Sequence, residues 1–289
     1  MSITTIAPPA VVTGAARAPL PYGLFSVLSP REAGMTADRW ENGVTFEALT
    51  CEPVMGIGQP QCDPEETVGL PKTLDAAGNE IGAASPFTVY GHFSCAPVGW
   101  TPEAAQGRAS AHLLAREEAR VEQALWTGDL GNTPNLVTDV TVLAGGAALP
   151  LGSGIAALEN WLATSYGSLG VIHVTRAAAL ELLRDGYIEA RNGRLETVLG
   201  TPVVAGAGYD GSGPTAPGEG QAWAYATPAL FGYRSEVFTS SSLAGDLLDR
   251  GVNTLYAVAE RTYLLGFDPC GHAGVILEGG GALVDEEVR

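Results

Sequence analysis

The stretch of sequence that decides the fold runs from Thr101 to Gly128 and reads TPEAAQGRASAHLLAREEARVEQALWTG. It begins with a threonine, a proline and a glutamate, which are typical of an N-cap, a first helical position and a first helical turn. From Arg108 to Thr127 it contains neither glycine nor proline, and Gly128 stands where a glycine cap ends a helix. We therefore predict a single helix over residues 102–127, about 35–40 Å long.

The composition of the whole chain indicates that part of its surface contacts other subunits. The chain has 289 residues, of which 46% are hydrophobic and only 16% are charged, against about 25% charged residues in a typical globular protein. The formal net charge is −17. No cluster of Lys and Arg stands out along the chain, so we expect no direct binding to nucleic-acid phosphates or to an anionic membrane.

The segments before the helix are extended in character. Residues 1–43 are rich in proline, alanine and glycine without a clear period, which indicates an arm rather than a packed unit. Strands are expected over 39–49 and 87–93, joined by a polar excursion of about 35 residues. Loops of that length in compact domains are usually functional, so we interpret this one as a long flap.

The segments after the helix alternate between helical and strand patterns, and from residue 135 to about 245 the pattern is mixed α/β. The expected helices cover residues 154–166 and 176–185, and the expected strands cover 170–174, 196–206, 222–226, 229–234, 253–265 and 273–277.

The motifs of common enzymes are missing. Lys72 is the only lysine of the chain and lies outside any phosphate-binding loop, and there is no G-x-S-x-G, H-E-x-x-H or paired C-x-x-C motif. Cys270 and His272 could supply two metal ligands, but such a loop pair is usually incidental, so we expect neither a metal nor a cofactor. The remaining histidines are interpreted as structural residues: His92, His112 and His173.

The sequence also predicts the cellular compartment in which the protein is found. The four cysteines, Cys51, Cys62, Cys95 and Cys270, are too few for a disulfide framework in a chain of this length. No signal peptide is recognised at the N-terminus, and no apolar run approaches the roughly 20 residues of a membrane span. We therefore expect a cytosolic protein with reduced thiols.

Three short motifs add a more specific signal. Residues 119–129 read ARVEQALWTGD, residues 199–204 read LGTPVV, and residues 257–261 read AVAER, followed by FDP at 267–269. In this order, together with the arm, the flap and the long helix, they resemble the tailed-phage major capsid proteins of the Hong Kong 97 fold, a fold that encapsulin shells share. The resemblance covers residues 35–280.

The resemblance implies an α+β fold and an organisation of the chain. Residues 1–43 would form an N-terminal arm, and residues 44–94 an extended loop that lies over a neighbouring subunit. A peripheral domain would combine residues 95–134, including the spine helix 102–127, with residues 246–289. Residues 135–245 would form an axial domain that meets its copies around five-fold and six-fold axes.

It also implies a function and partners. The chain would self-assemble, through pentamers and hexamers, into the icosahedral head shell of a tailed double-stranded DNA phage. The implied partners are a separate scaffolding protein, a portal and decoration proteins, with DNA enclosed but not bound sequence-specifically, and no membrane. The protein would be a virion component, assembled in the cytoplasm of the host bacterium. It would not be an enzyme in the ordinary sense.

Some members of this family join their subunits by isopeptide bonds between a lysine and an asparagine, with a glutamate that takes the proton. On the matching positions, the resemblance implies Lys72, Asn253 and Glu260 for these roles. Asn253 and Glu260 are separated by seven residues, which places them on opposite faces of a regular strand, so a bend would be needed to bring them together. The alternative is that Lys72 is a solvated loop residue.

Two other functions stay open at the level of sequence. The first is an encapsulin-type compartment shell, which would have the same fold but enclose cargo enzymes. The second is a soluble α/β enzyme with an unrecognised site. A shell protein should form very large particles, whereas such an enzyme should form a small oligomer.

Overall fold

The computed structural model describes residues 18–32, 39–48, 51, 80–96, 100–240, 248–249 and 254–281. Helix α1, Pro102–Thr127, has the bounds that the sequence predicts. The side chain of Thr101 accepts a hydrogen bond from the Ala104 amide at 3.2 Å, and Gly128 ends the helix in the left-handed conformation with φ 69°. Local sequence therefore sets both ends of this helix.

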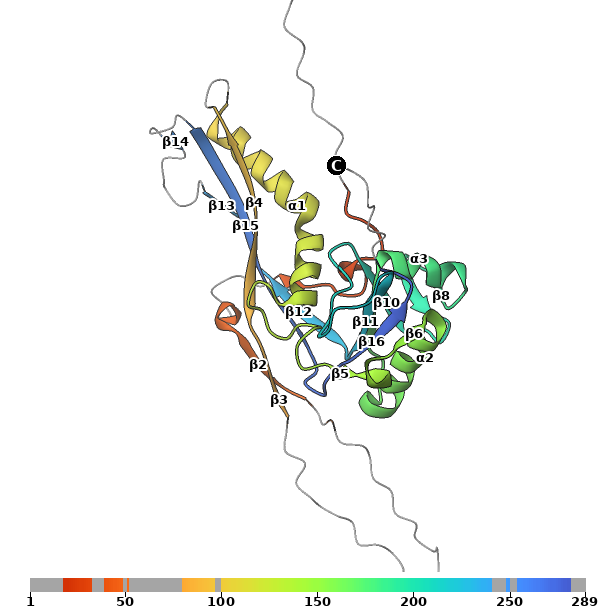
Figure 1. The fold of residues 1–289 in the computed structure, drawn as a ribbon. Helices are drawn as coiled ribbons and strands as arrows, with labels where there is room; N and C mark the ends of the chain where they lie inside the picture. Colours follow the sequence, from red (N-terminus) through yellow and green to blue (C-terminus); the bar gives the residue numbers. More distant parts are fainter. Residues whose placement is uncertain are drawn as a thin grey trace, which may run out of the picture.

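Helix α1 packs against a six-stranded sheet centred on β15, Thr254–Phe267 (Figure 1). Strand β4, Pro86–Cys95, runs antiparallel to β15 along most of its length. At Gly91 of β4 an added Cβ would lie 2.6 Å from the Leu113 amide nitrogen, so only glycine lets strand and helix approach this closely. The other strands of this sheet are short: β1 (Arg31–Glu32), β12 (Leu230–Arg234), β13 (Phe238–Thr239) and β14 (Leu248–Asp249).

An eight-stranded sheet forms the second large unit, with the strand order β5-β16-β11-β7-β10-β9-β8 and with β6 beside β16. Its strands are β5 (Thr141–Val142), β6 (Ala148–Pro150), β7 (Val171–Thr175), β8 (Ile188–Arg191), β9 (Arg194–Thr197), β10 (Pro202–Gly206), β11 (Gln221–Thr227) and β16 (Ala273–Glu278).

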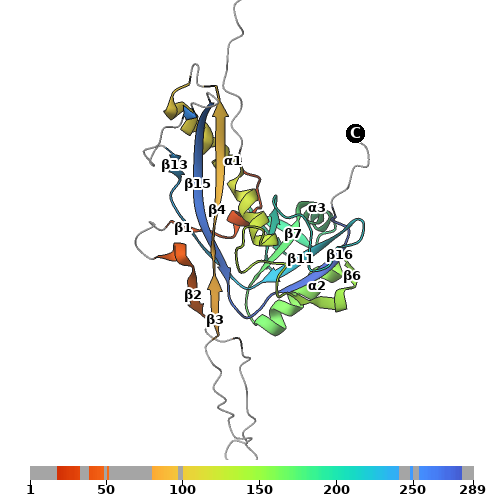
Figure 2. The ribbon, with the colours of Figure 1, turned by 60° about the vertical axis from the view of Figure 1, so that its left-hand side comes forward.

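Two helices pack beside this second sheet, as Figure 2 shows. They are α2, Leu151–Trp161, which continues into a π-helical turn over Leu162–Tyr166, and α3, Arg176–Arg184. Both helices lie close to their predicted positions. The predicted strand 196–206 is in fact two strands, β9 and β10, because a tight turn with a left-handed Gly200 (φ 93°) separates them.

A two-stranded ribbon projects from the six-stranded sheet. It pairs β2, Val44–Glu47, with β3, Ile81–Ala84, in antiparallel register. Phe46 stacks edge-on against Phe231 of β12, with ring centroids 4.8 Å apart. The ribbon therefore forms the root of the predicted flap, whose residues 52–79 lie outside the described part of the chain. Among the described residues, 3-10 turns cover Leu24–Ser26, Trp40–Asn42 and Leu143–Gly146.

Part of the N-terminal arm is packed, which differs from the sequence prediction. Leu24 is fully buried in the same apolar cluster as α1 and β15, and Leu28 is nearly so. Strand β1 adds to the six-stranded sheet beside β12. A few apolar residues without a period gave no helix or strand signal, but they are enough to anchor an arm on an existing core.

The expectation of reduced thiols is wrong for two of the cysteines. Cys51 and Cys270 form a disulfide with a Cα–Cα distance of 5.1 Å, although 219 residues separate them in the sequence. The bond links Cys51, in the segment that follows β2, to Cys270 in the turn between β15 and β16. Cysteine count could not predict it, because the pairing depends on tertiary contact between these two segments.

Each large sheet contains strands from both sides of residue 245 in the sequence. Strand β16, which follows it in sequence, pairs with β11 in the eight-stranded sheet, whereas β12 and β13, which precede it, pair with β15. Among the described residues, no helix is long and apolar enough to cross a membrane.

Candidate functional site

The arm, the spine helix and the loop after β10 meet at one buried carboxylate. Glu122 of α1 is completely buried. One of its oxygens accepts a hydrogen bond from the Leu24 amide at 2.8 Å, and the other accepts one from the Gly208 amide at 3.0 Å. A single side chain therefore joins three segments that are distant in sequence.

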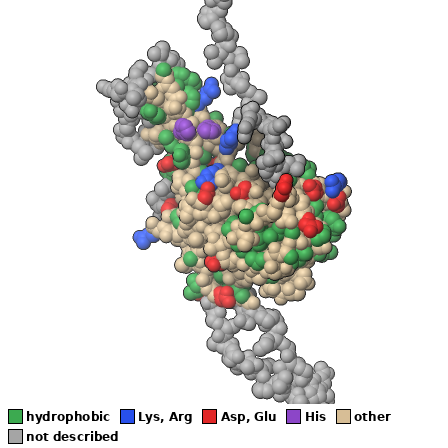
Figure 3. All heavy atoms as spheres, in the orientation of Figure 1, with side chains coloured by type: hydrophobic (Ala, Val, Ile, Leu, Met, Phe, Trp, Pro, Cys, Tyr) green, Lys and Arg blue, Asp and Glu red, His purple; other side chains and the backbone are tan. Residues whose placement is uncertain are grey.

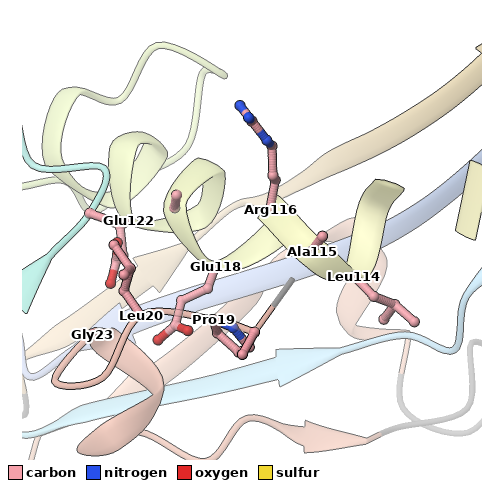
Figure 4. A pocket seen from close by; sticks show the side chains of 11 residues that line it. Pro19, Leu20, Gly23, Leu114, Ala115, Arg116, Glu118 and Glu122 are labelled. Carbon is pink, nitrogen blue, oxygen red and sulfur yellow. The ribbon is translucent and has the colours of Figure 1, made fainter. Parts of the chain in front are cut away.

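A second carboxylate extends this contact by one helical turn. Glu118 accepts a hydrogen bond from the Phe25 amide at 3.0 Å. In Figure 4 the side chains of Glu118 and Glu122 point toward the arm, and Arg116 points to the opposite side of α1. A groove of about 420 Å³ lies beside these carboxylates, between α1 and arm residues 18–23. The arm is thus held by its backbone amides rather than by particular side chains.

Burial raises the pKa of Glu122 to about 7, and the neighbouring Glu118 carboxylate acts in the same direction. The hydrogen bonds from the Leu24 and Gly208 amides oppose this rise, because they favour the charged form. Burial also raises the pKa of Glu118. The charge of this contact therefore changes near neutral pH.

The close approach of the loop to α1 depends on Gly208. An added Cβ at this position would lie 1.9 Å from the Ala119 carbonyl oxygen, so any other residue would push the loop away from the helix. The segment GAGYDGSG at 206–213 reads as a loop in the sequence. Nothing in that pattern indicates that one of its glycines contacts the long helix.

A buried ion pair ties the spine helix to β15. Nη1 of Arg261 donates to both carboxylate oxygens of Glu117, at 2.9 and 3.0 Å, and both side chains are about one-tenth exposed. The sequence motif AVAER draws attention to Arg261, but not to its partner, which is 144 residues away. The ion pair is a functional contact that sequence reasoning missed.

Of the three residues implied in cross-linking, only Glu260 lies in the described part of the chain. It is exposed on β15, where Tyr90 of β4 and Phe238 of β13 are its neighbours across the sheet. Lys72 and Asn253 lie outside the described residues. The described residues therefore do not show how the three lie relative to one another.

The histidines of the core have structural roles, as predicted for His173. Its ring nitrogens bond to the Tyr209 hydroxyl at 2.8 Å and the Thr227 hydroxyl at 3.0 Å, and burial lowers its pKa to about 3. His272 bonds to the Leu136 carbonyl oxygen at 3.0 Å, and Cys270 is in the disulfide. No three His, Cys, Asp or Glu side chains of the described residues gather as a metal site would require.

The LGTPVV motif forms a rigid turn with an apolar tip. The Glu159 carboxylate accepts hydrogen bonds from the hydroxyls of Thr197 and Thr201, which close the turn at both ends. Val198 and Leu199 at the tip are 61% and 78% exposed. A fixed turn that shows two apolar side chains to solvent is suited to contact with another protein surface.

No sequence family matches the chain, and no curated protein is similar to it. Solved structures are similar in fold at low sequence identity. A structure from Mycobacterium phage Ogopogo is 14% identical with a TM-score of 0.57, covering 94% of this chain and 97% of its own. One from Microbacterium phage Oxtober96 is 11% identical with a TM-score of 0.51, covering 96% of each chain.

The capsid of a native GTA particle is a further match, at 11% identity and a TM-score of 0.52, with 95% of each chain covered. The likeness extends over nearly the whole of both chains. At these identities it concerns the fold alone. The chain therefore has the Hong Kong 97 fold that its sequence motifs predict.

Proposed function

We propose that the chain is the major capsid protein of a tailed double-stranded DNA phage and builds the icosahedral head shell. The observation that carries the proposal is the match of 95% of the chain to 95% of a chain in the GTA capsid. A ribbon that projects from the core, and a turn with an apolar tip, supply surfaces that gain stability only against a partner.

On this proposal the chain keeps the organisation that the resemblance implies. Residues 1–43 form the arm and 44–94 the extended loop, while 95–134 with 246–289 and 135–245 form the peripheral and axial domains. Copies of the chain assemble as pentamers and hexamers, with a separate scaffolding protein, a portal and decoration proteins as partners. The shell encloses DNA without sequence-specific binding.

The compartment in which the particle assembles determines when the disulfide can form. We propose assembly in the host cytoplasm, where thiols are kept reduced. The bond between Cys51 and Cys270 then closes after release of the particle into an oxidising medium, with dioxygen or a small disulfide as the oxidant. It fixes the root of the extended loop only once assembly is complete.

Covalent cross-linking through Lys72, Asn253 and Glu260 remains part of the proposal as an alternative to a solvated Lys72. Assembled particles should be boiled in reductant and run on a denaturing gel. Ladders of multimers would support the cross-link. A single band near the 29.8 kDa of the chain would reject it.

The function itself is tested by size-exclusion chromatography and negative-stain imaging of the expressed protein, alone and with the scaffolding protein of its own gene cluster. Uniform closed shells are the expected result. A small oligomer under both conditions would overturn the proposal and favour a soluble enzyme. Shells that retain a cargo enzyme would favour an encapsulin-type compartment instead.

A further inference from the structure

Two histidines lie side by side on the surface, one on β4 and one on α1. The ring centroids of His92 and His112 are 6.1 Å apart, and the ring planes meet at 64°. Both side chains are exposed, whereas His173 and His272 are buried. The two purple side chains visible in Figure 3 are therefore His92 and His112. A solute can reach both rings at once.

A hydrogen bond to the backbone prepares the His112 ring to bind a metal ion. Its Nδ1 atom lies 3.2 Å from the carbonyl oxygen of His92. A carbonyl oxygen can only accept a hydrogen bond, so Nδ1 carries the proton and the lone pair of the neutral ring is on Nε2. Metal-binding histidines use this arrangement, in which one ring nitrogen donates to the backbone and the other binds the ion.

The distance between the rings suits a single shared ion. A zinc–nitrogen bond of about 2.0–2.1 Å places the centroids of two imidazoles on one ion about 5–6 Å apart. The observed separation of 6.1 Å differs from this range by less than the rotation of an exposed side chain provides. We propose that His92 and His112 form a binding site for one divalent transition-metal ion, which joins β4 to α1.

The donor atoms select the class of ion. Imidazole nitrogens suit Zn²⁺, Ni²⁺ and Cu²⁺, whereas Mg²⁺ and Ca²⁺ prefer oxygen ligands. In the part of the chain that the structure describes, no three His, Cys, Asp or Glu side chains gather as one metal site. Water therefore completes the coordination of an ion held by this pair. Such an open site binds more weakly than a structural zinc site with four protein ligands.

The charges around the pair act in both directions. Arg108 and Arg116 lie one helical turn on either side of His112 and repel a cation. Glu260 of β15 is exposed and is the diagonal neighbour of His92 across the sheet, and the chain as a whole has a formal net charge of −17. Repulsion from the arginines favours the ions with the strongest affinity for nitrogen ligands, so Ni²⁺ and Cu²⁺ should bind more tightly than Mn²⁺.

A bound ion should stabilise the contact between the strand and the helix. His92 and His112 are 20 residues apart in sequence, and their rings meet only when α1 lies on β4. The ion therefore binds both rings in the folded chain and not in the unfolded one. A ligand with this preference raises the stability of the folded state as its concentration increases.

Titration of the full-length chain with Ni²⁺ tests the site. Ni²⁺ should bind the wild type in calorimetry and raise the midpoint of its thermal unfolding, whereas Mg²⁺ should not. His92→Asn and His112→Asn should each weaken Ni²⁺ binding by about tenfold or more, because a direct ligand matters at least as much as its supporting partners. Ser94→Asn introduces the same side chain at an exposed position of the same strand and is the matched control.

The double variant His92→Asn/His112→Asn shows whether the two rings share one ion. If they do, it should bind Ni²⁺ little more weakly than each single variant, because one ring alone cannot chelate. Losses that add up in the double variant would mean two separate ions and would overturn the shared site.

Equal Ni²⁺ affinity in the wild type and both single variants would overturn the site altogether. Binding without a rise in the unfolding midpoint would overturn the link between β4 and α1. The test needs no assembled shell, so its result is independent of the proposed function.

Discussion

The two large sheets of this protein bury polar groups of different kinds. Around α1 and the six-stranded sheet, the buried or nearly buried polar side chains include charged ones, Glu117, Glu122 and Arg261. In the eight-stranded sheet they are neutral, with His173, Thr175 and Thr227 as examples. The first region therefore adds charged contacts between distant segments to its apolar core, whereas the buried polar side chains described in the second are neutral.

The difference matters for a subunit that must change its contacts during assembly. A buried charge costs free energy unless its partners stay in place, so its stability depends on the position of other segments and on pH. An apolar core with neutral hydrogen bonds lacks this dependence on partners. We expect the region around α1 to respond to substitution, to redox conditions and to pH near neutrality, and the eight-stranded sheet to respond to pH only in acid.

The largest effect should come from breaking the buried ion pair. Arg261→Met leaves Glu117 buried without its partner, so we expect a loss of about 3–5 kcal/mol in the free energy of unfolding. The double variant Glu117→Met/Arg261→Met should be close to wild type, because the buried charge is gone. Urea unfolding of the unassembled chain measures both values.

Arg120→Met is the control for this prediction, since it removes the more exposed pair with Asp129 and should cost less than about 1 kcal/mol. A double variant as unstable as the single one would show that packing, rather than the unpaired charge, causes the loss.

The eight-stranded sheet should respond to acid through His173. Its pKa of about 3 in the folded state lies below the value of about 6.5 for the unfolded chain. Between these values the unfolded chain binds a proton that the folded chain does not, so stability is complete above pH 6.5 and falls as the pH is lowered. The expected loss at pH 4 is about 3 kcal/mol.

His173→Gln cannot titrate, and it retains a donor and an acceptor for Tyr209 and Thr227. Its urea midpoints at pH 7 and pH 4 should therefore differ less than those of wild type. Equal pH dependence in both proteins would mean that His173 takes up a proton in the folded state.

The site at Glu122 should respond in the opposite direction. Its pKa of about 7 in the folded state lies above the ordinary value of 4.5, so the folded chain binds the extra proton between these values. Stability is then highest below pH 4.5 and declines as the pH rises through 7, by about 2–3 kcal/mol. Glu122→Gln should remove this decline.

Glu219→Gln is the matched control, because it makes the same change at an exposed position in the loop before β11. Denaturant unfolding at pH 5 and pH 8 distinguishes the two variants. If Glu122→Gln keeps the wild-type slope with pH, the carboxylate is charged in the folded chain throughout this range.

The smallest effect should come from the disulfide at the root of the extended loop. Reduction of the bond between Cys51 and Cys270 should lower the free energy of unfolding by about 2 kcal/mol, the low end for disulfides, because the ribbon can detach while the sheets stay folded. Thermal unfolding with and without reductant checks this for wild type and for Cys51→Ser.

Reductant should leave Cys51→Ser unchanged, and Cys95→Ser should behave like wild type because Cys95 is not in a disulfide. A fully reduced wild type with unchanged stability would show that the bond does not constrain the ribbon.

Only part of the candidate site could be predicted from the sequence. The carboxylates Glu118 and Glu122 look like ordinary surface residues of a helix. Nothing local shows that arm amides cover them.

The sequence by itself determined the long helix and the order of the elements. A threonine N-cap, a proline, an uninterrupted run of helix formers and a glycine cap act within a few residues of each other, so the bounds of α1 followed without tertiary information. The motifs around Glu122, Leu199 and Arg261 then predicted the fold.

Only the tertiary structure decided which distant groups meet. Glu117 and Arg261 are 144 residues apart, Glu122 and Leu24 are 98 apart, and the two cysteines of the disulfide are 219 apart. Local propensity carries no information on such pairs, because their contact free energy exists only after the sheets have formed. Burial then fixes their partners and raises the pKa of Glu122, which no pattern along the chain records.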